Sequence, residues 1–370
     1  MASSIDINKI GKLGFGYMRL PKIDGKADLE QVNKMADAFL QSGGTYFDAA
    51  YVYDGAEVAL RETVIKRHPR ESFQVASKLP VGMVNAERPL EHFLETSLER
   101  LGTDYIDFYL LHGIDAKGSK LAEENGAWEY FAKLKEQGII RHIGFSFHGP
   151  PDDLDEILTK HPETEFVQLQ LNYWDWDNPK VNSRKMYEIV TKHGVPFTIM
   201  VPLLGGKLAS PDSPIAELML KANPNASVAS WALRYIAHLD GVITTLSGMS
   251  TYEQMLDNIE IYADYKPLDA DELKIIDKAI ELLKAVPRIQ CTSCEYCKDC
   301  PANIPISSLI NLYNDFLVHK TTENLAGTYN WLSGGKGKAK DCTACGFCED
   351  VCPQKLQIIE VLGKVSDMFD

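Results

Sequence analysis

The chain has 370 residues, of which 45% are hydrophobic and 24% are charged, and its formal net charge is −14. These proportions are ordinary for a folded globular protein and exclude a disordered chain. The negative charge leaves no overall basic field for a phosphate backbone, so nucleic acid is not expected as a partner. The start lacks the pattern of a signal peptide, and no stretch reaches the ~20 apolar residues of a membrane helix. We therefore expect a cytoplasmic protein with no membrane contact.

Apolar runs alternate with amphipathic segments from residue 13 to residue 260. Eight runs have the length and composition of buried parallel strands, namely residues 13–19, 45–50, 72–78, 105–112, 141–146, 166–172, 195–201 and 241–248. Helical patterns follow them, at residues 29–40, 56–67, 87–101, 127–137, 151–160, 183–193, 227–238 and 251–260. Eight such pairs predict a closed (β/α)₈ barrel. An open doubly wound sheet is the alternative, but no GxGxxG motif follows the first strand.

The composition changes after the predicted barrel. Residues 268–286 have the pattern of a helix that begins with the capping-box residues Asp269 and Glu272 and stops before Pro287. All eight cysteines follow this helix, and residues 1–290 contain none. We therefore predict three parts, which are a barrel at residues 1–267, a bridging helix at residues 268–287 and a small cysteine-rich domain at residues 288–370.

Four ionisable residues lie at the ends of neighbouring predicted strands, where barrels of this type place their active sites. Asp48 ends the second strand with Tyr53 in the loop behind it, Lys78 ends the third, and His112 ends the fourth. Each residue alone has a plain structural explanation, such as a helix cap or a packed histidine. Together they can give a proton to a carbonyl oxygen, because an ammonium lowers the pKa of a nearby phenol and a carboxylate keeps the ammonium charged.

The motifs around these residues resemble the aldo-keto reductases over residues 8–265. The resemblance is carried by FDAAYVYDGAE, VASK and YIDFYLLH, followed in order by GFSFH, VQLQLNYW, PLLGG and SGMSTYEQMLDNIE. It implies reduction of an aldehyde or ketone by hydride transfer from NAD(P)H. Under this resemblance Tyr53 is the general acid, Lys78 and Asp48 tune it, and His112 positions the substrate.

The same resemblance implies a set of cofactor-binding residues. These are Ser146 and Gln168 for the nicotinamide amide with Asn172 nearby, Pro202, Leu203 and Gly205 in the segment PLLGG, and Gly248, Gln254 and Asn258 for the adenosine end. The loop LLGGKLAS is the candidate for the diphosphate, and a plain flexible loop is the alternative. Backbone N–H groups near glycines suit the diphosphate, because they can approach an anion closely. Gln254 stands where many relatives carry an arginine for the 2′-phosphate, so the choice between NADH and NADPH stays open.

Aromatic residues are frequent in the segments predicted as loops on the same rim. Tyr51, Trp128, Trp174 and Trp176 are candidates for the wall of an apolar substrate pocket. Simple packing against the barrel is the alternative for each of them.

The cysteines form two similar motifs. Cys342, Cys345, Cys348 and Cys352 follow C-x₂-C-x₂-C-x₃-C-P, the spacing of ferredoxins in which the fourth cysteine binds the other of two 4Fe–4S clusters. Cys291, Cys294, Cys297 and Cys300 follow the same plan with one residue fewer before the last cysteine. Two structural zinc sites are the alternative. The tail resembles the ferredoxin-like dicluster module of some aldo-keto reductases, so the predicted fold is an α/β TIM barrel followed by a small α-rich ferredoxin-like iron–sulfur domain.

The predicted barrel and the predicted iron–sulfur domain imply electron transfer in different units. A nicotinamide gives two electrons as a hydride, whereas a cluster accepts one, and a flavin normally bridges such steps. No flavin fingerprint is visible, although a barrel can hold a flavin without one. The alternative function is therefore an iron–sulfur electron-transfer protein, linked to a ferredoxin, a flavin or a redox partner protein, with the barrel as a scaffold. A barrel that binds nucleotide without turnover is a third possibility.

Overall fold

The computed structural model describes residues 5–179, 181–210, 213–291, 293–322 and 324–370. It divides the chain into two compact units, the first made of Met1–Leu203 and Ala232–Leu268, the second of Leu204–Trp231 and Asp269–Asp370. The segment Leu204–Trp231 lies within the range predicted as barrel, yet it groups with the C-terminal region. In the described part of the chain, no helix combines the length and the apolar character needed to cross a bilayer.

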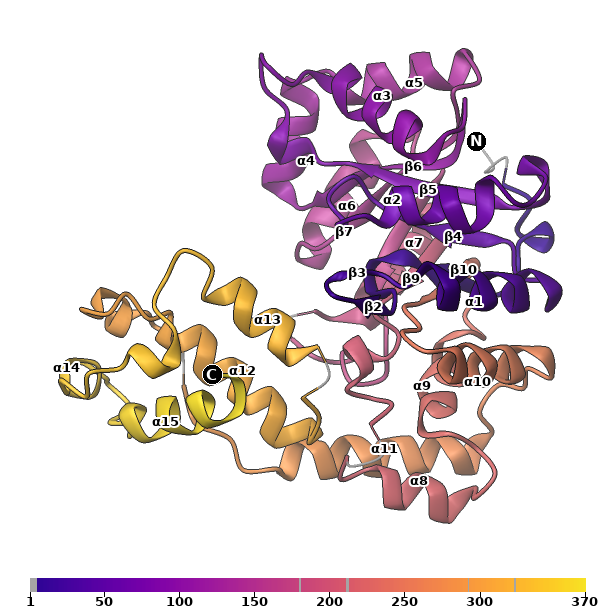
Figure 1. Cartoon of the computed structure of the whole chain (residues 1–370). Coiled ribbons are helices and arrows are strands. Elements are labelled where there is room, and N and C mark those ends of the chain that lie inside the picture. The colour runs from indigo at the N-terminus through magenta and orange to yellow at the C-terminus, as the bar shows by residue number, and fades with distance from the viewer. Residues whose placement is uncertain (1–4, 180, 211–212, 292, 323) are drawn as a thin grey trace. The chain divides into compact units, whose positions relative to one another are not determined.

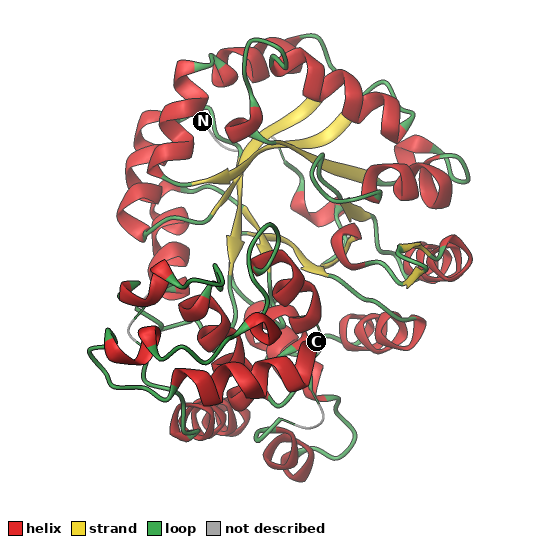
Figure 2. Ribbon diagram, turned by 60° about the vertical axis from the view of Figure 1, so that its left-hand side comes forward, coloured by secondary structure: helices red, strands yellow, loops and turns green. Residues whose placement is uncertain are grey.

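The first unit contains a closed barrel of eight parallel strands, as predicted, and the open-sheet alternative is excluded (Figures 1 and 2). The strands are β1 (Leu13–Gly16), β4 (Tyr46–Asp48), β5 (Gln74–Leu79), β6 (Ile106–Ile114), β7 (Ile140–Phe147), β8 (Phe166–Gln170), β9 (Phe197–Met200) and β10 (Val242–Ser247). Neighbours around the barrel follow the chain order, and β1 closes the ring by pairing with both β4 and β10. A short antiparallel pair, β2 (Lys22–Ile23) and β3 (Lys26–Ala27), follows β1 in the chain.

Helices surround this barrel (Figure 2). Their apolar residues are buried together with those of the strands. The helices are α1 (Leu29–Gln41), α2 (Ala56–Leu60), α3 (Leu90–Leu101), α4 (Ala116–Glu124), α5 (Ala127–Glu136), α6 (Pro151–Lys160), α7 (Ser183–His193) and α10 (Tyr252–Ala263). The helix α9 (Val228–Ile236) crosses the point where the chain passes from one unit to the other. The sequence analysis missed α4, because its sequence AKGSKLAEE offers few apolar residues to mark a buried face.

The second unit is helical, with a small core of its own. Its helices are α8 (Ala216–Ala222), α11 (Ala270–Ala285), α12 (Ile306–His319), α13 (Leu325–Leu332), α14 (Phe347–Asp350) and α15 (Ile358–Phe369). The predicted capping box opens α11, because Asp269 accepts from the N–H of Glu272 and the Glu272 side chain accepts from the N–H of Asp269. The helix α12 packs against both α13 and α15, and Cys348 and Cys352 are buried in the same core.

Candidate active site and cysteine cavities

The barrel register brings the predicted catalytic residues of β4, β5 and β6 together at the carboxyl ends of these strands. Asp48 is the register partner of Ala76, and Lys78, two residues further along β5, is the partner of Leu110. His112 lies two residues beyond Leu110 on β6. Side chains two residues apart on a strand share a face. Lys78 and His112 each lie two positions further along than the register partner of the residue before them in this set. Asp48, Lys78 and His112 therefore lie on the same face of the neighbouring strands.

Lys78 and Asp48 form a fully buried ion pair. The Lys78 Nζ lies 2.7 Å from both carboxylate oxygens of Asp48 and 2.7 Å from the carbonyl oxygen of Ala49. The Lys78 side chain has no exposed surface, and that of Asp48 is 7% exposed. Burial alone lowers the pKa of Lys78, but Asp48 and Tyr53 outweigh it and the pKa is raised. The ammonium therefore keeps its charge, and its three donors all point to oxygen.

Tyr53 lies in the loop after β4, beside Lys78 and His112. The Lys78 Nζ is 4.8 Å from the centroid of the Tyr53 ring, and the Tyr53 and His112 rings meet edge to face at 5.6 Å. Burial raises the pKa of Tyr53, and the Lys78 ammonium opposes that rise. The expected lowering by Lys78 is present, but the net shift is upward because burial of the phenol dominates. Tyr53 consequently holds its proton at neutral pH, as a proton donor must.

His112 is a neutral histidine in this site. Burial lowers its pKa to about 3, with further lowering from Lys78 and His148. A neutral imidazole donates from one ring nitrogen and accepts at the other. His112 can therefore hydrogen-bond a carbonyl oxygen or a hydroxyl without adding charge to the site. His148, which directly follows β7, was not among the predicted site residues.

The two residues predicted for the nicotinamide amide lie side by side. Ser146 on β7 and Gln168 on β8 are register partners, and both are buried. The N–H of Gly113 donates to Ser146 Oγ at 2.8 Å, which leaves the serine O–H as a donor. Gln168 Nε2 donates to Asp48 Oδ2 at 3.4 Å, which leaves the amide oxygen of Gln168 as an acceptor. This donor and acceptor pair matches the two ends of a carboxamide.

The side chain of Asn172 is hydrogen-bonded to other residues of the protein. Its Nδ2 donates to Asp175 Oδ2 at 2.9 Å and to the carbonyl oxygen of Val201 at 3.2 Å. Its Oδ1 accepts from the N–H of Asp175 at 2.9 Å. The structure thus uses Asn172 to connect the turn after β8 with the end of β9.

The residues predicted for the adenosine end lie in and after the loop that follows β10. A side chain on Gly248 would come within 3.4 Å of the Arg19 side chain, so the two residues are packed together. Gln254 Oε1 accepts from the N–H of Ser250 at 2.8 Å. Asn258 is buried and donates to Ser247 Oγ at 2.8 Å. Sequence reasoning did not select Arg19, although its position shortly after β1 marks it as a residue of the same rim.

The predicted diphosphate segment is divided between the two units. Pro202 and Leu203 belong to the first unit with Ser146 and Gln168, whereas Gly205 belongs to the second. Leu204, Gly205 and Gly206 have φ angles of 48°, 68° and 94°, so three consecutive residues are left-handed. The chain therefore turns sharply at this point.

The prediction that Trp128 lies in a rim loop is wrong. Trp128 is buried within α5 and stacks on His161 with ring centroids 4.1 Å apart. Trp128 belongs to the apolar face of α5 that packs inside the protein. The sequence pattern of α5 also shows this apolar face. Tyr51 and Trp176 do lie in loops, where Tyr51 packs against Phe93 and Arg100.

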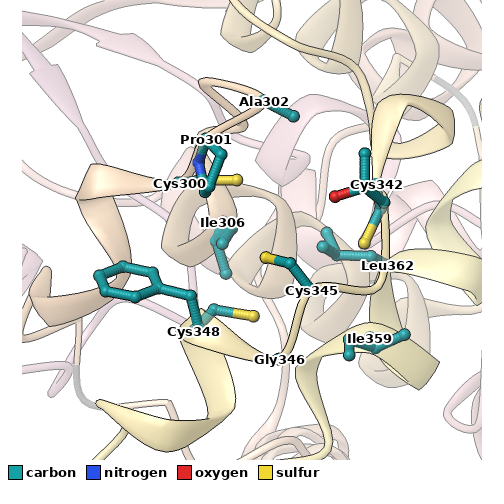
Figure 3. A pocket seen from close by; sticks show the side chains of 12 residues that line it. Cys300, Pro301, Ala302, Ile306, Cys342, Cys345, Gly346, Cys348, Ile359 and Leu362 are labelled. Atoms are coloured by element: carbon teal, nitrogen blue, oxygen red, sulfur yellow. The ribbon is translucent and has the colours of Figure 1, made fainter.

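The eight cysteines line two cavities in the second unit. One cavity, partly open to solvent, is lined by Cys300, Cys342, Cys345 and Cys348. Their four sulfur atoms turn toward the same space (Figure 3). The other cavity is lined by Cys291, Cys294, Cys297 and Cys352. Each cavity thus combines three cysteines of one motif with the last cysteine of the other motif.

The two cavities each offer four thiols, which is the donor set of 4Fe–4S clusters and of structural zinc sites alike. Among the described residues, no group of three or more His, Cys, Asp or Glu side chains is placed to hold a metal ion. The two motifs also turn alike, since Ser293 and Glu295 around Cys294, and Ala344 and Gly346 around Cys345, all have positive φ. Both loops therefore curl around their cavity in the same way.

Two protein-family models match the barrel part and the cysteine-rich part of the chain. The aldo/keto reductase family model matches residues 12–281, and the 4Fe–4S dicluster domain model matches residues 290–357. The chain belongs to the aldo/keto reductase family. An aldo-keto reductase of Mycolicibacterium smegmatis is 26% identical over 276 residues, which are 74% of this chain and 88% of the relative.

Solved structures of family members share the barrel. The holo form of an aldo-keto reductase from Bacillus halodurans superimposes with a TM-score of 0.58 at 24% identity, covering 72% of this chain and 91% of that one. An aldo/keto reductase from Klebsiella pneumoniae in complex with NADP and acetate gives a TM-score of 0.57 at 22% identity, covering 73% and 91%. These matches extend over the barrel of the chain and confirm its fold.

Replacing Lys78 by Met should lower the free energy of unfolding by about 3–5 kcal/mol, because it leaves the Asp48 carboxylate buried without its partner. The double variant Asp48→Asn/Lys78→Met should lose less, since it removes the unpaired charge as well. Urea unfolding followed by far-ultraviolet circular dichroism measures both. Lys34→Met, which breaks only the exposed pair with Glu30, should change little. Equal losses in the single and double variants would contradict the coupling.

Proposed function

We propose that this chain reduces an aldehyde or ketone with NAD(P)H, with Tyr53 as the general acid, and that it carries two 4Fe–4S clusters. The observation that supports the reductase activity is the buried Asp48–Lys78 pair beside Tyr53 and His112, at the strand ends of an aldo/keto reductase barrel. A small carbonyl compound is accordingly the proposed substrate.

The proton side of the reaction follows from the contacts of Tyr53. The bound nicotinamide supplies the hydride for the carbonyl carbon. Tyr53 gives its proton to the carbonyl oxygen, which becomes the hydroxyl of an alcohol. The phenolate left on Tyr53 is stabilised by the Lys78 ammonium, whose charge Asp48 maintains. His112, which is neutral, hydrogen-bonds the carbonyl oxygen and orients it toward Tyr53.

Ser146 and Gln168 are the proposed partners of the nicotinamide carboxamide, because one offers a hydroxyl donor and the other an amide oxygen. Asn172, Pro202, Leu203, Gly205, Gly248, Gln254 and Asn258 complete the proposed cofactor site. Gln254 is neutral and already accepts from Ser250, so no charged contact with a 2′-phosphate is proposed at this position. The proposal therefore covers NADH and NADPH alike.

Each cysteine cavity is proposed to hold one 4Fe–4S cluster. A cluster supplies one-electron transfer, and its binding contributes folding energy to a domain with a small core. We propose residues 288–370 as this domain, with residues 1–267 as the barrel, residues 268–287 as the bridging helix, and a redox partner protein as the source or acceptor of electrons. Cysteine spacing that suits metal ligation fits a reducing compartment, so we propose a cytoplasmic location.

Replacing Tyr53 by Phe should lower kcat/KM for carbonyl reduction by about 10²–10⁴-fold, because the proton donor is lost while the ring remains. The dissociation constant of NADPH should stay close to that of the unchanged protein. Steady-state reduction of a panel of aldehydes and ketones, with nucleotide binding measured by fluorescence, tests this. The matched control is Tyr105→Phe, since Tyr105 lies between Arg70 and Arg141 and takes no part in the site. Undiminished turnover in Tyr53→Phe would remove Tyr53 from the mechanism.

The rate should not respond to protonation of His112 in the neutral range. Because the pKa of His112 is lowered to about 3, the imidazole stays neutral from about pH 5 to about pH 8. The pKa of Tyr53 is raised, so the acid should lose its proton only above about pH 10. We expect a level kcat/KM over the neutral range and a decline on the alkaline side. An inflection near the ordinary histidine pKa, at saturating nucleotide, would contradict a neutral His112.

Pairs of cysteine variants should reveal the exchanged ligands. If Cys300 completes the cluster of the second motif, Cys300→Ser/Cys345→Ser damages one cluster, and about four of about eight iron atoms per chain remain. Cys300→Ser/Cys294→Ser then damages both clusters and leaves little iron. Ligation within each motif would give the opposite pattern. Iron and sulfide analysis of anaerobically purified protein distinguishes the two results.

A further inference from the structure

The loop between α13 and the second cysteine motif is a basic segment of an acidic chain. Residues 324–340 contain three lysines and no carboxylate, whereas the whole chain has a net charge of −14. Lys336 and Lys340 are exposed. Lys338 is half-buried, and its Nζ lies 3.6 Å from Asp370 Oδ1. The loop therefore presents two ammonium groups, those of Lys336 and Lys340, to the solvent.

Three carboxylates around this loop are hydrogen-bonded to backbone N–H groups. Asp341 Oδ2 accepts from the N–H of Lys338 at 2.7 Å, and Asp370 Oδ2 accepts from the N–H of Lys340 at 3.1 Å. Glu349 on α14 accepts from a backbone N–H of α15 at 2.8 Å. The fold therefore uses these carboxylates to fix the backbone of the loop and of α15.

Gly337 places the loop against the wall of the cavity that contains Cys342. A Cβ on Gly337 would lie 2.0 Å from the carbonyl oxygen of Ala302, and the N–H of Gly337 donates to the carbonyl oxygen of Asn303 at 3.0 Å. Ala302 and Cys342 both line the cavity (Figure 3). Any larger residue at position 337 would push the loop off this wall. Lys336, the neighbour of Gly337 in the chain, is therefore held beside the cavity.

Tyr329 and Asp370 keep the end of the loop in place. Tyr329 is buried and stacks on Phe369 with ring centroids 5.1 Å apart. Its hydroxyl donates to Asp370 Oδ2 at 2.6 Å and accepts from the N–H of Ala339 at 2.9 Å. A partner that binds Lys340 does not have to order this part of the chain, so binding costs less conformational entropy.

Trp331 adds an exposed aromatic side chain next to the loop. It lies at the end of α13 and is 78% exposed, although Leu325 and Tyr329 of the same helix are buried. Its carbonyl oxygen accepts from the N–H of Gly334 at 3.2 Å, and the chain then runs through the loop to α14 (Figure 1). Tryptophan is enriched among the residues that dominate the binding energy of protein interfaces. We call Trp331, Lys336 and Lys340 the basic patch.

We propose that the basic patch is the docking site of an acidic protein that carries single electrons, such as a ferredoxin or a flavodoxin. This inference rests on the proposed function, in which the cavity beside the patch holds a 4Fe–4S cluster. The carrier loses one electron as the cluster gains it, or the reverse, and no atom is transferred. The two lysines bind carboxylates of the carrier, and Trp331 packs against the apolar centre of the contact.

The charge of the whole chain makes the patch selective. A net charge of −14 repels an acidic carrier at long range, whereas the two exposed lysines attract it locally. The carrier is therefore turned toward the surface that borders the cavity. An anionic bilayer would be attracted by the same lysines, but a single indole offers it little apolar area to take up. A bilayer also makes no use of the position beside the cavity.

The first test measures binding to the anaerobic, iron-loaded chain, with an acidic plant-type 2Fe–2S ferredoxin and a flavodoxin as probes. At low salt, Lys336→Gln/Lys340→Gln should weaken binding about ten-fold, because the contact loses two ammonium groups. Trp331→Ala should weaken it by a similar factor without a change of charge. Added salt should weaken binding more in the unchanged protein than in the double lysine variant.

The matched control is Lys274→Gln/Lys278→Gln. These two exposed lysines belong to α11 of the same unit, so the control removes the same charge at another place. Its dissociation constants should stay within about two-fold of those of the unchanged protein, since only long-range charge is altered. A loss as large as that of the patch variant would show that net charge alone controls binding and would contradict a docking site.

The second test locates the contact by cross-linking. A carbodiimide joins lysine amines to carboxylates of the bound ferredoxin, and mass spectrometry should recover Lys336 and Lys340 as the linked residues. Cross-links found instead at Lys274 and Lys278 would contradict the proposed surface. If the double lysine variant purifies with less iron, Trp331→Ala and the cross-links still decide the question, because neither changes the loop on the cavity wall.

The outcomes separate three cases. Unchanged protein that purifies anaerobically without iron overturns the clusters of the proposed function. Iron-loaded protein that binds neither probe, or binds both equally tightly in Trp331→Ala and in Lys336→Gln/Lys340→Gln, overturns the docking site alone. Binding to vesicles that contain phosphatidylserine, lost in the double lysine variant and without binding of either carrier, assigns the patch to a membrane and also overturns the proposal.

Discussion

The ion pair between Lys78 and Asp48 constrains the strand register and the neighbouring side chains of the barrel site. An ammonium without exposed surface is tolerated only where a carboxylate and further oxygens replace its water, and here three contacts of 2.7 Å do so. These contacts require β4 and β5 to meet in one register, which the closed barrel enforces. The fixed charge then faces Tyr53 and depresses the basicity of His112. Burial keeps Tyr53 protonated and His112 neutral, while the Lys78 ammonium opposes the rise in the pKa of Tyr53 and adds to the lowering of the pKa of His112.

The two units are stabilised in different ways. The barrel unit has a continuous apolar core between strands and helices, and its polar residues occupy defined points within it. The second unit has far fewer buried apolar residues, and two of its cysteines belong to that small core. Ile289, Ser293 and Glu295, near the first two cysteines, are instead held by Asn314, Asn311 and Ser307 of α12. A bound cluster would therefore act as part of the core of this unit, whereas a bound nucleotide would only add to a barrel already formed.

The sequence predicts what depends on local pattern. All eight barrel strands were predicted because buried parallel strands are continuous apolar runs, and Asp48, Lys78 and His112 were selected because they lie at the ends of predicted strands. The sequence pattern does not predict the helix α4, because the few apolar residues of α4 do not mark a buried face. It also does not predict that Trp128 packs inside the protein as part of α5. The net rise in the pKa of Tyr53 depends on burial, which no spacing reveals. Likewise, Lys207 and Asp315 are far apart in the chain, so no local sequence pattern predicts their contact.

The exchange of cysteines between the two cavities affects how the chain matures. The first motif, at Cys291, Cys294 and Cys297, meets its fourth thiol only at Cys352, which precedes the last 18 residues. The second cavity needs Cys345 and Cys348 as well as Cys300. Translation runs from the N-terminus, so the barrel strands are all made before either ligand set exists. A cluster bound in either cavity would therefore be completed only after the barrel strands and the last cysteine of its ligand set have been made.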